Sequence, residues 1–298
     1  MAKKDDVPDV SVVIPTAGEA HRWRSLEQAI ASIQAGNDIS MDILVVLNGS
    51  RYCRELRTTL EARDDIRVLY LPEGDLTKAI ARGRQAVSGR YYCFLDDDDE
   101  YLPGSLTHRL AYLDNNPALD VLVSNGYRHN ANTGEQNLMF DRLESNQDDP
   151  LMGLVRGNWL ASCGGLFRTD TVESSYFLGI QKYFEWTWLA IRLSLSRNIG
   201  FLDVPAFIVN DTPGSLSKST AYLNREVDFL QRVLQEVDIP ASFRRHLHRK
   251  LAAKYIGFAN NSLAEGHKRE ALSYYLSCLG SGRAGLAYWL WARKLFFR

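Results

Sequence analysis

Cysteine is scarce in this 298-residue chain, and no run of apolar residues is long. The four cysteines lie far apart, without a C-x-x-C pair or clustered histidines, at Cys53, Cys93, Cys163 and Cys278. This spacing argues against a disulfide framework and a zinc site, and it fits a reducing compartment. No apolar stretch reaches the roughly 18 residues that a membrane-spanning helix needs, and the N-terminal MAKKDDVPDV lacks the apolar core of a signal peptide. The sequence therefore predicts a cytoplasmic protein.

An excess of charge of one sign is also lacking, because 35 Lys and Arg nearly balance 36 Asp and Glu and leave a formal net charge of −1. A chain that binds polyanions along its whole length is normally far more basic, so we expect no nucleic-acid partner. The sequence contains no G-x-S-x-G, P-loop or G-x-G-x-x-G motif. Hydrolase, nucleoside triphosphatase and dinucleotide-binding functions therefore lack their local requirement.

Short apolar runs alternate with helical patterns over the first hundred residues. The strands expected from these runs cover residues 10–14, 43–47, 66–70 and 91–95. Unbroken apolar runs of this length are typical of strands that are buried on both faces of a parallel sheet. We therefore predict an α/β fold with a mostly parallel, Rossmann-like sheet flanked by helices.

Beyond Pro103 the pattern is looser. Shorter apolar segments predict strands at 121–123 and 199–202, and a periodic segment predicts a helix over Glu185–Ser196. Polar residues dominate Asn130–Pro150, which has many Asn, Gln and Asp and which we interpret as a long loop or an insertion. The alternation of strands and helices thus continues, with shorter elements, to about residue 202.

A run of acidic residues follows the strand expected at 91–95. It consists of Asp96, Asp97, Asp98, Asp99 and Glu100. Carboxylates this close repel one another and raise one another's pKa unless a cation lies among them. Open α/β sheets bind ligands at the carboxyl ends of their strands, and oxygen ligands suit Mg²⁺ or Mn²⁺, which in turn suit phosphate groups. The alternative is a solvated acidic turn, but the position at a strand end favours binding of a metal and a diphosphate.

The segments VSVVIPT, LVVLNGS and FLDDDDEYLP, in this order, resemble the pattern of family 2 glycosyltransferases with the GT-A fold. The resemblance covers about residues 9 to 218 and is most specific in the first strand and the acidic run. It implies a nucleotide-sugar donor, with a UDP-sugar favoured, and it places the D-x-D motif of the family on Asp96 and Asp98. Asp98 would be the principal ligand of Mg²⁺ or Mn²⁺, with Asp96 beside it. Asp96 and Asp97 would lie near the ribose and the diphosphate.

The resemblance implies further donor-binding residues, with departures from the family pattern. In the loop after the first strand these residues are Pro15, Thr16 and Glu19. A plain strand-to-helix turn is the alternative for that loop. Asn48 stands where the family usually has Asp, and its amide oxygen can still accept a hydrogen bond from a nucleotide base. Ile80 stands where the family has Arg, so Lys78 is an alternative cation for the diphosphate and Arg82 is another. Either could instead be an ordinary exposed helix charge.

Family members that invert the anomeric centre need a carboxylate that takes the proton of the acceptor hydroxyl. The family carries it in an E-D-W-D-like helix start, where this chain has Glu185 followed by Trp186. We take Glu185 as the candidate base, because aromatic neighbours can raise its pKa by desolvation. The alternative is an acidic residue that merely favours a helix N-terminus. Trp186, Gly165 and Arg168 correspond to acceptor-binding positions, although the glycine segment could equally be a turn in the core.

The segment Asp211–Thr220 is rich in Pro, Gly, Ser and Thr and is the best candidate for a domain boundary. We place a catalytic domain at 1–218 and a helical C-terminal extension at 219–298.

Residues 241–298 contain eleven Lys and Arg against two Glu, so this segment carries +9 and the other 240 residues carry −10. The final Gly285–Arg298 mixes aromatic and basic residues, which suits a helix on the anionic inner face of a membrane. Its alternative is a bundle helix that packs on the catalytic domain or on a second subunit of a homodimer.

These features predict a metal-dependent inverting glycosyltransferase. Its acceptor would be a glycan or a lipid-linked saccharide in surface polysaccharide or glycolipid synthesis. One alternative is a nucleotidyltransferase, which shares acidic metal sites at strand ends but usually opens with a Gly-rich basic loop, unlike Pro15–Arg24. The other is a catalytically silent protein that binds a nucleotide-sugar, which the departures at Leu47, Ile80 and Trp186 make conceivable.

Overall fold

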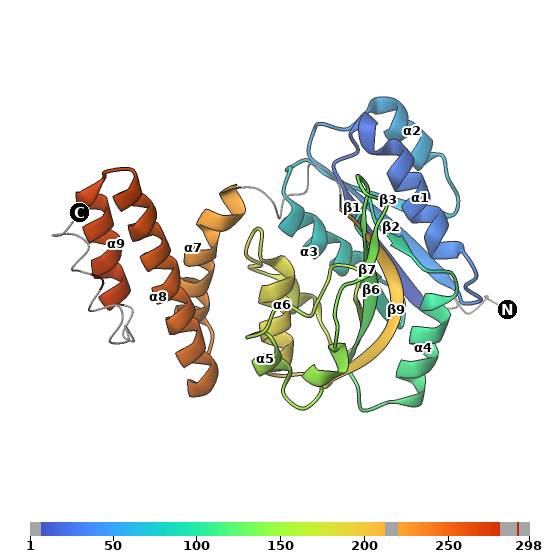
Figure 1. Ribbon diagram of the computed structural model, residues 1–298. Helices are drawn as coiled ribbons and strands as arrows, with labels where there is room; N and C mark the ends of the chain where they lie inside the picture. Colours follow the sequence, from blue (N-terminus) through green and yellow to red (C-terminus); the bar gives the residue numbers. More distant parts are fainter. Residues whose placement is uncertain (1–6, 212–219, 281–290, 292–298) are drawn as a thin grey trace. The chain divides into compact units, whose positions relative to one another are not determined.

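The computed structural model describes residues 7–211, 220–280 and Trp291. The chain divides into two compact units, Met1–Ser215 and Leu216–Arg298, and each unit is described by itself (Figure 1). The boundary expected at residue 218 falls outside the described residues. The assignment of catalysis to the first unit therefore stays a prediction.

Within the described residues, the first unit is built on a nine-stranded sheet in the order β3-β2-β1-β4-β8-β6-β9-β5, with β7 paired to β6. The strands are β1 Val10–Thr16, β2 Met41–Asn48, β3 Ile66–Leu71, β4 Tyr91–Phe94, β5 Glu100–Tyr101, β6 Val121–Asn130, β7 Gln136–Leu138, β8 Gly165–Arg168 and β9 Ile199–Asp211. Strands β1 to β4 are parallel, whereas β8 runs antiparallel to β4 and β6, and β5 runs antiparallel to β9. The predicted α/β fold is confirmed.

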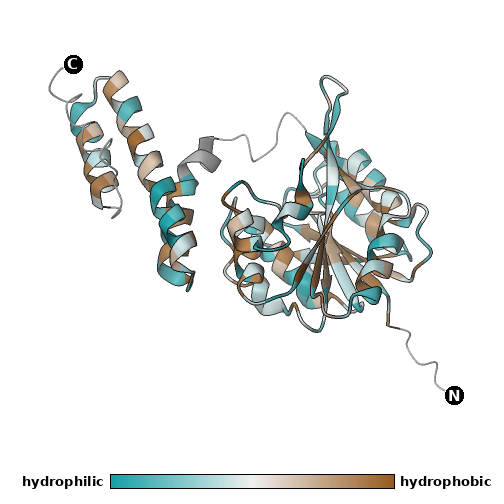
Figure 2. Cartoon of the chain, turned by 60° about the horizontal axis from the view of Figure 1, so that its bottom comes forward, coloured by the Kyte–Doolittle hydropathy of each residue, from teal (hydrophilic) through white to brown (hydrophobic). Residues whose placement is uncertain are grey.

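Helices cover both faces of this sheet (Figure 1). Those on one face are α1 (Trp23–Gln34), α2 (Arg54–Glu61) and α4 (Ser105–Asn115), and those on the other are α3 (Leu76–Ala86) and α6 (Glu185–Ser194). Short helical segments complete the unit: η1 (Ala20–Arg22), η2 (Leu143–Asn146), α5 (Pro150–Gly153) and η3 (Ser174–Phe177). Hydrophobic residues gather along the central strands between the two helical layers (Figure 2).

Alternation along β1 explains how both layers are attached. Successive side chains of a strand point to opposite faces, so Val10 and Val12 pack in the core cluster that contains α1, α2 and α4. Val13 faces α3, where a Cβ added to Gly83 would lie 2.3 Å from Val13 Cγ1. Glycine at position 83 therefore lets α3 approach the sheet closely, and this approach fixes where the first turn of α3 lies.

The structure changes two expectations about the later part of this unit. The segment Asn130–Pro150 fits an insertion rather than one long loop, because it contains β7 and η2. The strand expected at 199–202 continues as β9 to Asp211 and pairs with β6 in parallel, with register shifts near Asn125. Pro205 breaks the apolar pattern of the sequence, but a register irregularity allows a strand to continue past a proline. The longer β9 is what reaches the candidate site.

The second unit is helical in its described part. Its helices are α7 (Thr220–Glu236), α8 (Ala241–Ala264) and α9 (Lys268–Gly280). The Glu226 carboxylate joins α7 to α8, because it forms ion pairs with Lys250 at 2.9 Å and with Lys254. Among the described residues, no helix is both long enough and apolar enough to cross a bilayer.

Trp291 is the described residue of the aromatic and basic tail segment. It is buried, its ring stacks on Tyr275 with centroids 5.1 Å apart, and its Nε1 donates to Asn260 Oδ1 at 2.8 Å. This aromatic residue thus packs within the helical unit itself, so its contacts test neither the membrane contact nor the packing on the catalytic domain or a second subunit. The rest of Gly285–Arg298 lies outside the described residues.

Candidate active site

The acidic run lies where β4 ends, beside the carboxyl ends of β1 and β2. Asp97 and Asp99 are buried, and Asp96 is half-buried. Burial and then the negative charge of Asp98 raise the pKa of Asp96 to about 7. Burial and then the charges of Asp96 and Asp98 raise the pKa of Asp99. Negative charge is therefore crowded and poorly solvated here, which is the condition that a bound cation relieves.

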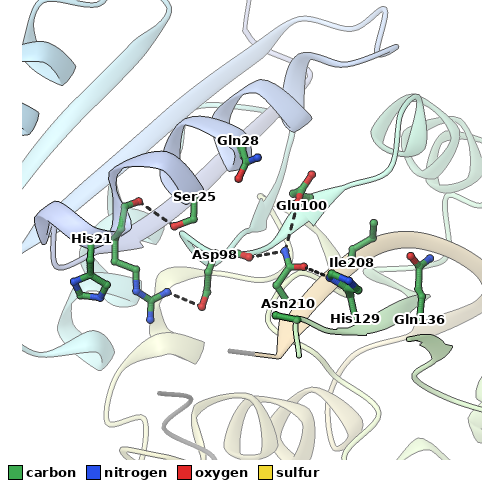
Figure 3. Close-up of a pocket in the computed structure, with 11 residues that line it drawn as sticks. His21, Ser25, Gln28, Asp98, Glu100, His129, Gln136, Ile208 and Asn210 are labelled. Atoms are coloured by element: carbon green, nitrogen blue, oxygen red, sulfur yellow. Dashed lines mark hydrogen bonds and ion pairs between the residues drawn. The ribbon is translucent and has the colours of Figure 1, made fainter. Parts of the chain in front are cut away.

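Two residues from the β1 side hold Asp97 and Asp98 (Figure 3 shows the Asp98 contact). Thr16 Oγ1 donates to Asp97 Oδ2 at 2.5 Å. Arg22 Nη1 lies 3.1 Å from Asp97 Oδ1 and 2.5 Å from Asp98 Oδ2. Burial raises the pKa of Asp97, whereas its contacts with Thr16 and Arg22 lower it. The sequence predicts Thr16 at this site, but Arg22 belongs to no motif that could have identified it.

Asn210, near the end of β9, holds the run from the other side (Figure 3). Its backbone N–H donates to Asp99 Oδ1 at 3.0 Å, and its Nδ2 donates to the carbonyl oxygen of Asp98 at 2.8 Å. Its Oδ1 lies 3.0 Å from His129 Nδ1. Sequence reasoning missed Asn210 because it ended the strand at Leu202, and only the pairing of β9 with β5 and β6 brings Asn210 to the acidic run.

The predicted donor loop follows β1. Asn48 Nδ2 donates to the carbonyl oxygen of Thr16 at 3.0 Å, so it joins the ends of β1 and β2. Pro15 lies within β1 and is buried. Glu19 forms an ion pair with Arg51 at 2.9 Å, in the loop after β2. The structure therefore brings Thr16 and Asn48 together at the strand ends, with Pro15 beneath them and Glu19 in the adjoining loop.

The first turn of α3 carries the predicted cation. Asp75 is its N-cap, and its Oδ1 accepts the backbone N–H groups of Thr77 at 2.8 Å and Lys78 at 3.3 Å. The side chain of Lys78 is exposed. Ile80 is buried in the core. Lys78 can therefore offer charge to an anionic group, whereas the side chain at position 80 packs in the interior.

Glu185 is the first residue of α6, and only 8% of it is exposed. The backbone N–H of Tyr183 donates to Glu185 Oε1 at 3.0 Å. Among the described non-glycine residues, only Tyr183 has a positive φ, at 73°, and such strained residues cluster at functional sites. Burial raises the pKa of Glu185, while the backbone N–H groups of Glu185 and Tyr183 lower it. The charge of Glu185 adds to the effects of burial and Asp98 that raise the pKa of Asp96, so the two carboxyl groups interact.

A pocket of about 700 Å³ opens beside Asp98 (Figure 3). Most of the residues that line it are polar, and they come from η1, α1, the acidic run, β6, β7 and β9, including Arg22, Ser25, Asp98, Glu100, His129 and Asn210. Of the residues expected from the sequence, Asp98 is the one that lines this pocket. The pocket therefore adjoins the acidic run on the side of Arg22 and Asn210.

Comparison with known proteins identifies the family of this chain. Residues 11–168 match the family described as glycosyl transferase family 2. The chain belongs to this family. An uncharacterized glycosyltransferase of Rickettsia prowazekii is 32% identical over 120 residues, which are 40% of this chain and 36% of that protein. A Campylobacter jejuni protein, GalNAc(5)-diNAcBac-PP-undecaprenol beta-1,3-glucosyltransferase, is 31% identical over 111 residues, 34% of this chain and 33% of that protein.

Solved structures similar to this family 2 member confirm its fold. S. aureus TarS 1–349 in complex with UDP-GlcNAc superposes with a TM-score of 0.64 and 16% identity, over 91% of this chain and 80% of that chain. The complex of the same protein with UDP gives a TM-score of 0.60 and 16% identity, over 92% of this chain and 79% of that chain. The expected GT-A fold is therefore confirmed. The chain spans about a third of the length of these two curated relatives.

Two of the acceptor-side residues expected in this family 2 member lie near β4. The ring of Trp186 is half-buried and meets the ring of Phe94, the last residue of β4, with centroids 5.3 Å apart. Gly165 lies within β8, where an added Cβ would be 2.3 Å from the ring of Phe167. Core packing thus requires the glycine, and both residues lie near the end of β4, where the acidic run begins.

Arg168 lies apart from the other residues that the sequence assigns to the site. It pairs with Tyr91, the first residue of β4, so it lies at the end of the strand opposite to the acidic run. Its guanidinium donates to the carbonyl oxygens of Leu119 at 2.6 Å and Leu113 at 2.7 Å and to the hydroxyl of Tyr91 at 2.8 Å. The expectation that Arg168 contacts the acceptor is therefore corrected: its donors bind the scaffold.

The acidic run fits a divalent metal in part. Mg²⁺ is usually held by one or two carboxylates together with substrate phosphate and water oxygens, and Asp98 and Asp96 can supply these carboxylates. Within 7–211, 220–280 and Trp291, no cluster of three or more His, Cys, Asp or Glu side chains is arranged to hold a metal. Oxygens of the donor diphosphate would therefore have to complete the coordination.

Proposed function

We propose that this family 2 member transfers a sugar from a nucleotide-sugar to an acceptor hydroxyl, with inversion at the anomeric carbon. The observation that carries the proposal is that one unit holds two kinds of carboxyl group. The acidic run at the end of β4, whose Asp97 is held by Thr16 and Arg22, suits a cation and a diphosphate. Glu185 is a buried carboxyl at the start of α6, which suits proton transfer. Metal-dependent transfer with inversion uses a group of each kind.

The donor would lie over the ends of β1, β2 and β4. Thr16 and Asn48 occupy the ends of β1 and β2. Asn48 Nδ2 already donates to the carbonyl oxygen of Thr16, so the amide oxygen of Asn48 is the atom that would accept a hydrogen bond from the nucleotide base. Lys78 would approach the diphosphate from the first turn of α3, and Asp96 and Asp97 would lie near it. Pro15 and Glu19 would flank the nucleotide. The TarS structure that contains UDP-GlcNAc supports a UDP-sugar.

Asp98 and Asp96 would hold Mg²⁺ or Mn²⁺. When bound, this ion supplies positive charge that neutralises the departing nucleoside diphosphate. The protein keeps the carboxylates in place for it, because Thr16 holds Asp97 and Asn210 holds the backbone of Asp98. No reorganisation of these oxygens is then needed when charge develops on the leaving group.

Glu185 would accept the proton of the attacking hydroxyl. Its raised pKa makes the carboxylate a stronger base than an exposed glutamate, and the Tyr183 N–H orients the carboxyl group through Oε1. Trp186 follows it on α6 and would offer a ring face to an acceptor sugar. Gly165 would border this space from β8.

The acceptor would be a glycan or a lipid-linked saccharide in surface polysaccharide or glycolipid synthesis. The name of the C. jejuni relative, which includes GalNAc(5)-diNAcBac-PP-undecaprenol, supports a lipid-linked acceptor. The +9 charge of residues 241–298 supports a location in the cytoplasm at an anionic membrane surface. The protein would act there as a monomer or as a homodimer. Flotation with anionic liposomes should capture the intact chain and lose it when residues 284–298 are deleted, whereas equal flotation of both forms would contradict the membrane contact.

The test of the proposed function is a thermal-shift screen of UDP, GDP and dTDP with Mn²⁺, followed by product analysis with the matching nucleotide-sugars. A ligand at 100 times its Kd stabilises a protein by about 2.7 kcal/mol, so the correct nucleoside diphosphate should raise Tm clearly. Turnover should release nucleoside diphosphate. Release of pyrophosphate would support the nucleotidyltransferase instead, and donor binding without any turnover would support the silent binding protein.

A further inference from the structure

Arg22 places one guanidinium nitrogen between two neighbouring carboxylates of the acidic run. Arg22 Nη1 is 3.1 Å from Asp97 Oδ1 and 2.5 Å from Asp98 Oδ2. The side chain is 29% exposed, so the contact is partly shielded from water. Charged hydrogen bonds of this length are among the stronger contacts of a protein, and this one neutralises part of a run whose carboxyl groups repel each other.

Other groups also hold the segment that carries these two carboxylates. Thr16 Oγ1 donates to the Asp97 carboxylate, at Oδ2, over 2.5 Å. Asn210 Nδ2 donates to the backbone carbonyl oxygen of Asp98 at 2.8 Å. If the guanidinium withdraws, Asp97 keeps a hydrogen bond to its carboxylate and Asp98 keeps a hydrogen bond to its backbone, while both carboxylates lose a positive neighbour.

The guanidinium also has room to withdraw. Arg22 lines the pocket of about 700 Å³ beside Asp98, together with Ser25 and His129. Its backbone lies in η1 and is anchored by a hydrogen bond from Arg22 N to Glu19 O at 2.9 Å. The long side chain can therefore rotate into the pocket while the Arg22 backbone keeps its hydrogen bond to Glu19.

We infer that Arg22 is the resident cation of Asp97 and Asp98 and that a divalent metal binds this run by displacing it. The inference rests on the proposed function, because it uses the metal site on Asp98. A guanidinium and a metal ion cannot share Asp98 Oδ2 at bonding distance, since both are cations that need the same oxygen. Arg22 therefore partly neutralises the run before the metal arrives, and it weakens metal binding by competition.

The test measures Mn²⁺ binding directly, by loss of the free-ion signal in electron paramagnetic resonance, without donor or acceptor. Arg22→Gln should bind Mn²⁺ about tenfold more tightly than the natural protein, because it removes a competitor worth about 1.4 kcal/mol. Arg22→Lys keeps a competing charge and should stay close to the natural affinity. Arg51→Gln is the matched control, since Arg51 pairs with Glu19, and its Mn²⁺ affinity should not change.

A second measurement uses the natural protein and needs no variant that could fail to fold. Addition of Mg²⁺ should shift the side-chain Nε–H resonance of Arg22 in a ¹⁵N spectrum, because its carboxylate partners are taken away, while the resonance of Arg51 stays in place. An unmoved Arg22 resonance overturns the inference. So does an Arg22→Gln variant that is folded but binds Mn²⁺ equally or more weakly. The inference is also overturned if none of the forms binds Mn²⁺. In that case the proposed transferase function still holds if turnover releases nucleoside diphosphate.

Discussion

Replacing Glu185 with glutamine should lower turnover strongly without weakening the fold. Glutamine has nearly the same shape as glutamate, and its amide oxygen can still accept the Tyr183 N–H that lies 3.0 Å from Glu185 Oε1. It cannot take up a proton from an acceptor hydroxyl. A general base contributes about 10²–10⁴ to the rate, which corresponds to about 3–5 kcal/mol of activation free energy.

The same substitution should lower turnover but raise the free energy of unfolding at high pH. Burial raises the pKa of Glu185 above its ordinary value of 4.5, so the folded state disfavours the charged carboxylate. The contribution of this group to the free energy of unfolding is therefore fully present below about pH 4.5, and it is lost as pH rises through the raised pKa. Glutamine is neutral at every pH, so Glu185→Gln should be as stable as the natural protein at pH 4.5 and more stable at pH 8. Each unit of the pKa shift corresponds to about 1.36 kcal/mol.

The two effects are measured by nucleoside diphosphate release and by urea unfolding at pH 4.5 and pH 8. Glu173→Gln is the matched control, because Glu173 is an exposed glutamate beside η3, and it should alter neither quantity. The kcat/KM of the natural protein should also fall on the acid side below a pKa higher than that of an exposed glutamate. Turnover of Glu185→Gln within tenfold of the natural rate would refute the base assignment, and an equal loss of stability at both pH values would refute its electrostatic explanation.

Four further outcomes follow from the structure. Asp98→Asn should abolish the Mn²⁺-dependent part of nucleoside diphosphate binding in calorimetry, and unchanged affinity would contradict its role as the metal ligand. Gly83→Ala should destabilise the first unit by about 1–3 kcal/mol in denaturation, since its Cβ would lie 2.3 Å from Val13 Cγ1. Gly257→Ala, in α8 with nothing within 4 Å of the added Cβ, should instead stabilise the helical unit by about 1 kcal/mol. Asn210→Ala should cost about 1–3 kcal/mol, because it removes the donor to the Asp98 carbonyl oxygen, and a smaller loss would show that β5 pairing alone holds the run.

Sequence reasoning located the acidic run because its signal is local. A buried strand that ends in carboxylates is visible within ten residues, from Tyr91 to Glu100, and the sheet then confirms this order of elements. Reasoning from single segments failed where the pattern was interrupted. Pro205 hid the continuation of β9, and Arg168 matched a motif position although the antiparallel pairing of β8 places it beside Tyr91.

The sequence by itself determined the α/β fold, the parallel strands β1 to β4 and the place of the acidic run, because apolar runs, alternation and turn residues act over neighbouring positions. Only the tertiary structure decided which groups hold that run. Arg22 precedes Asp97 by 75 residues and Asn210 follows Asp98 by 112. Contacts over such distances depend on strand order and on the close packing of helices on the sheet, and no local pattern of residues records them.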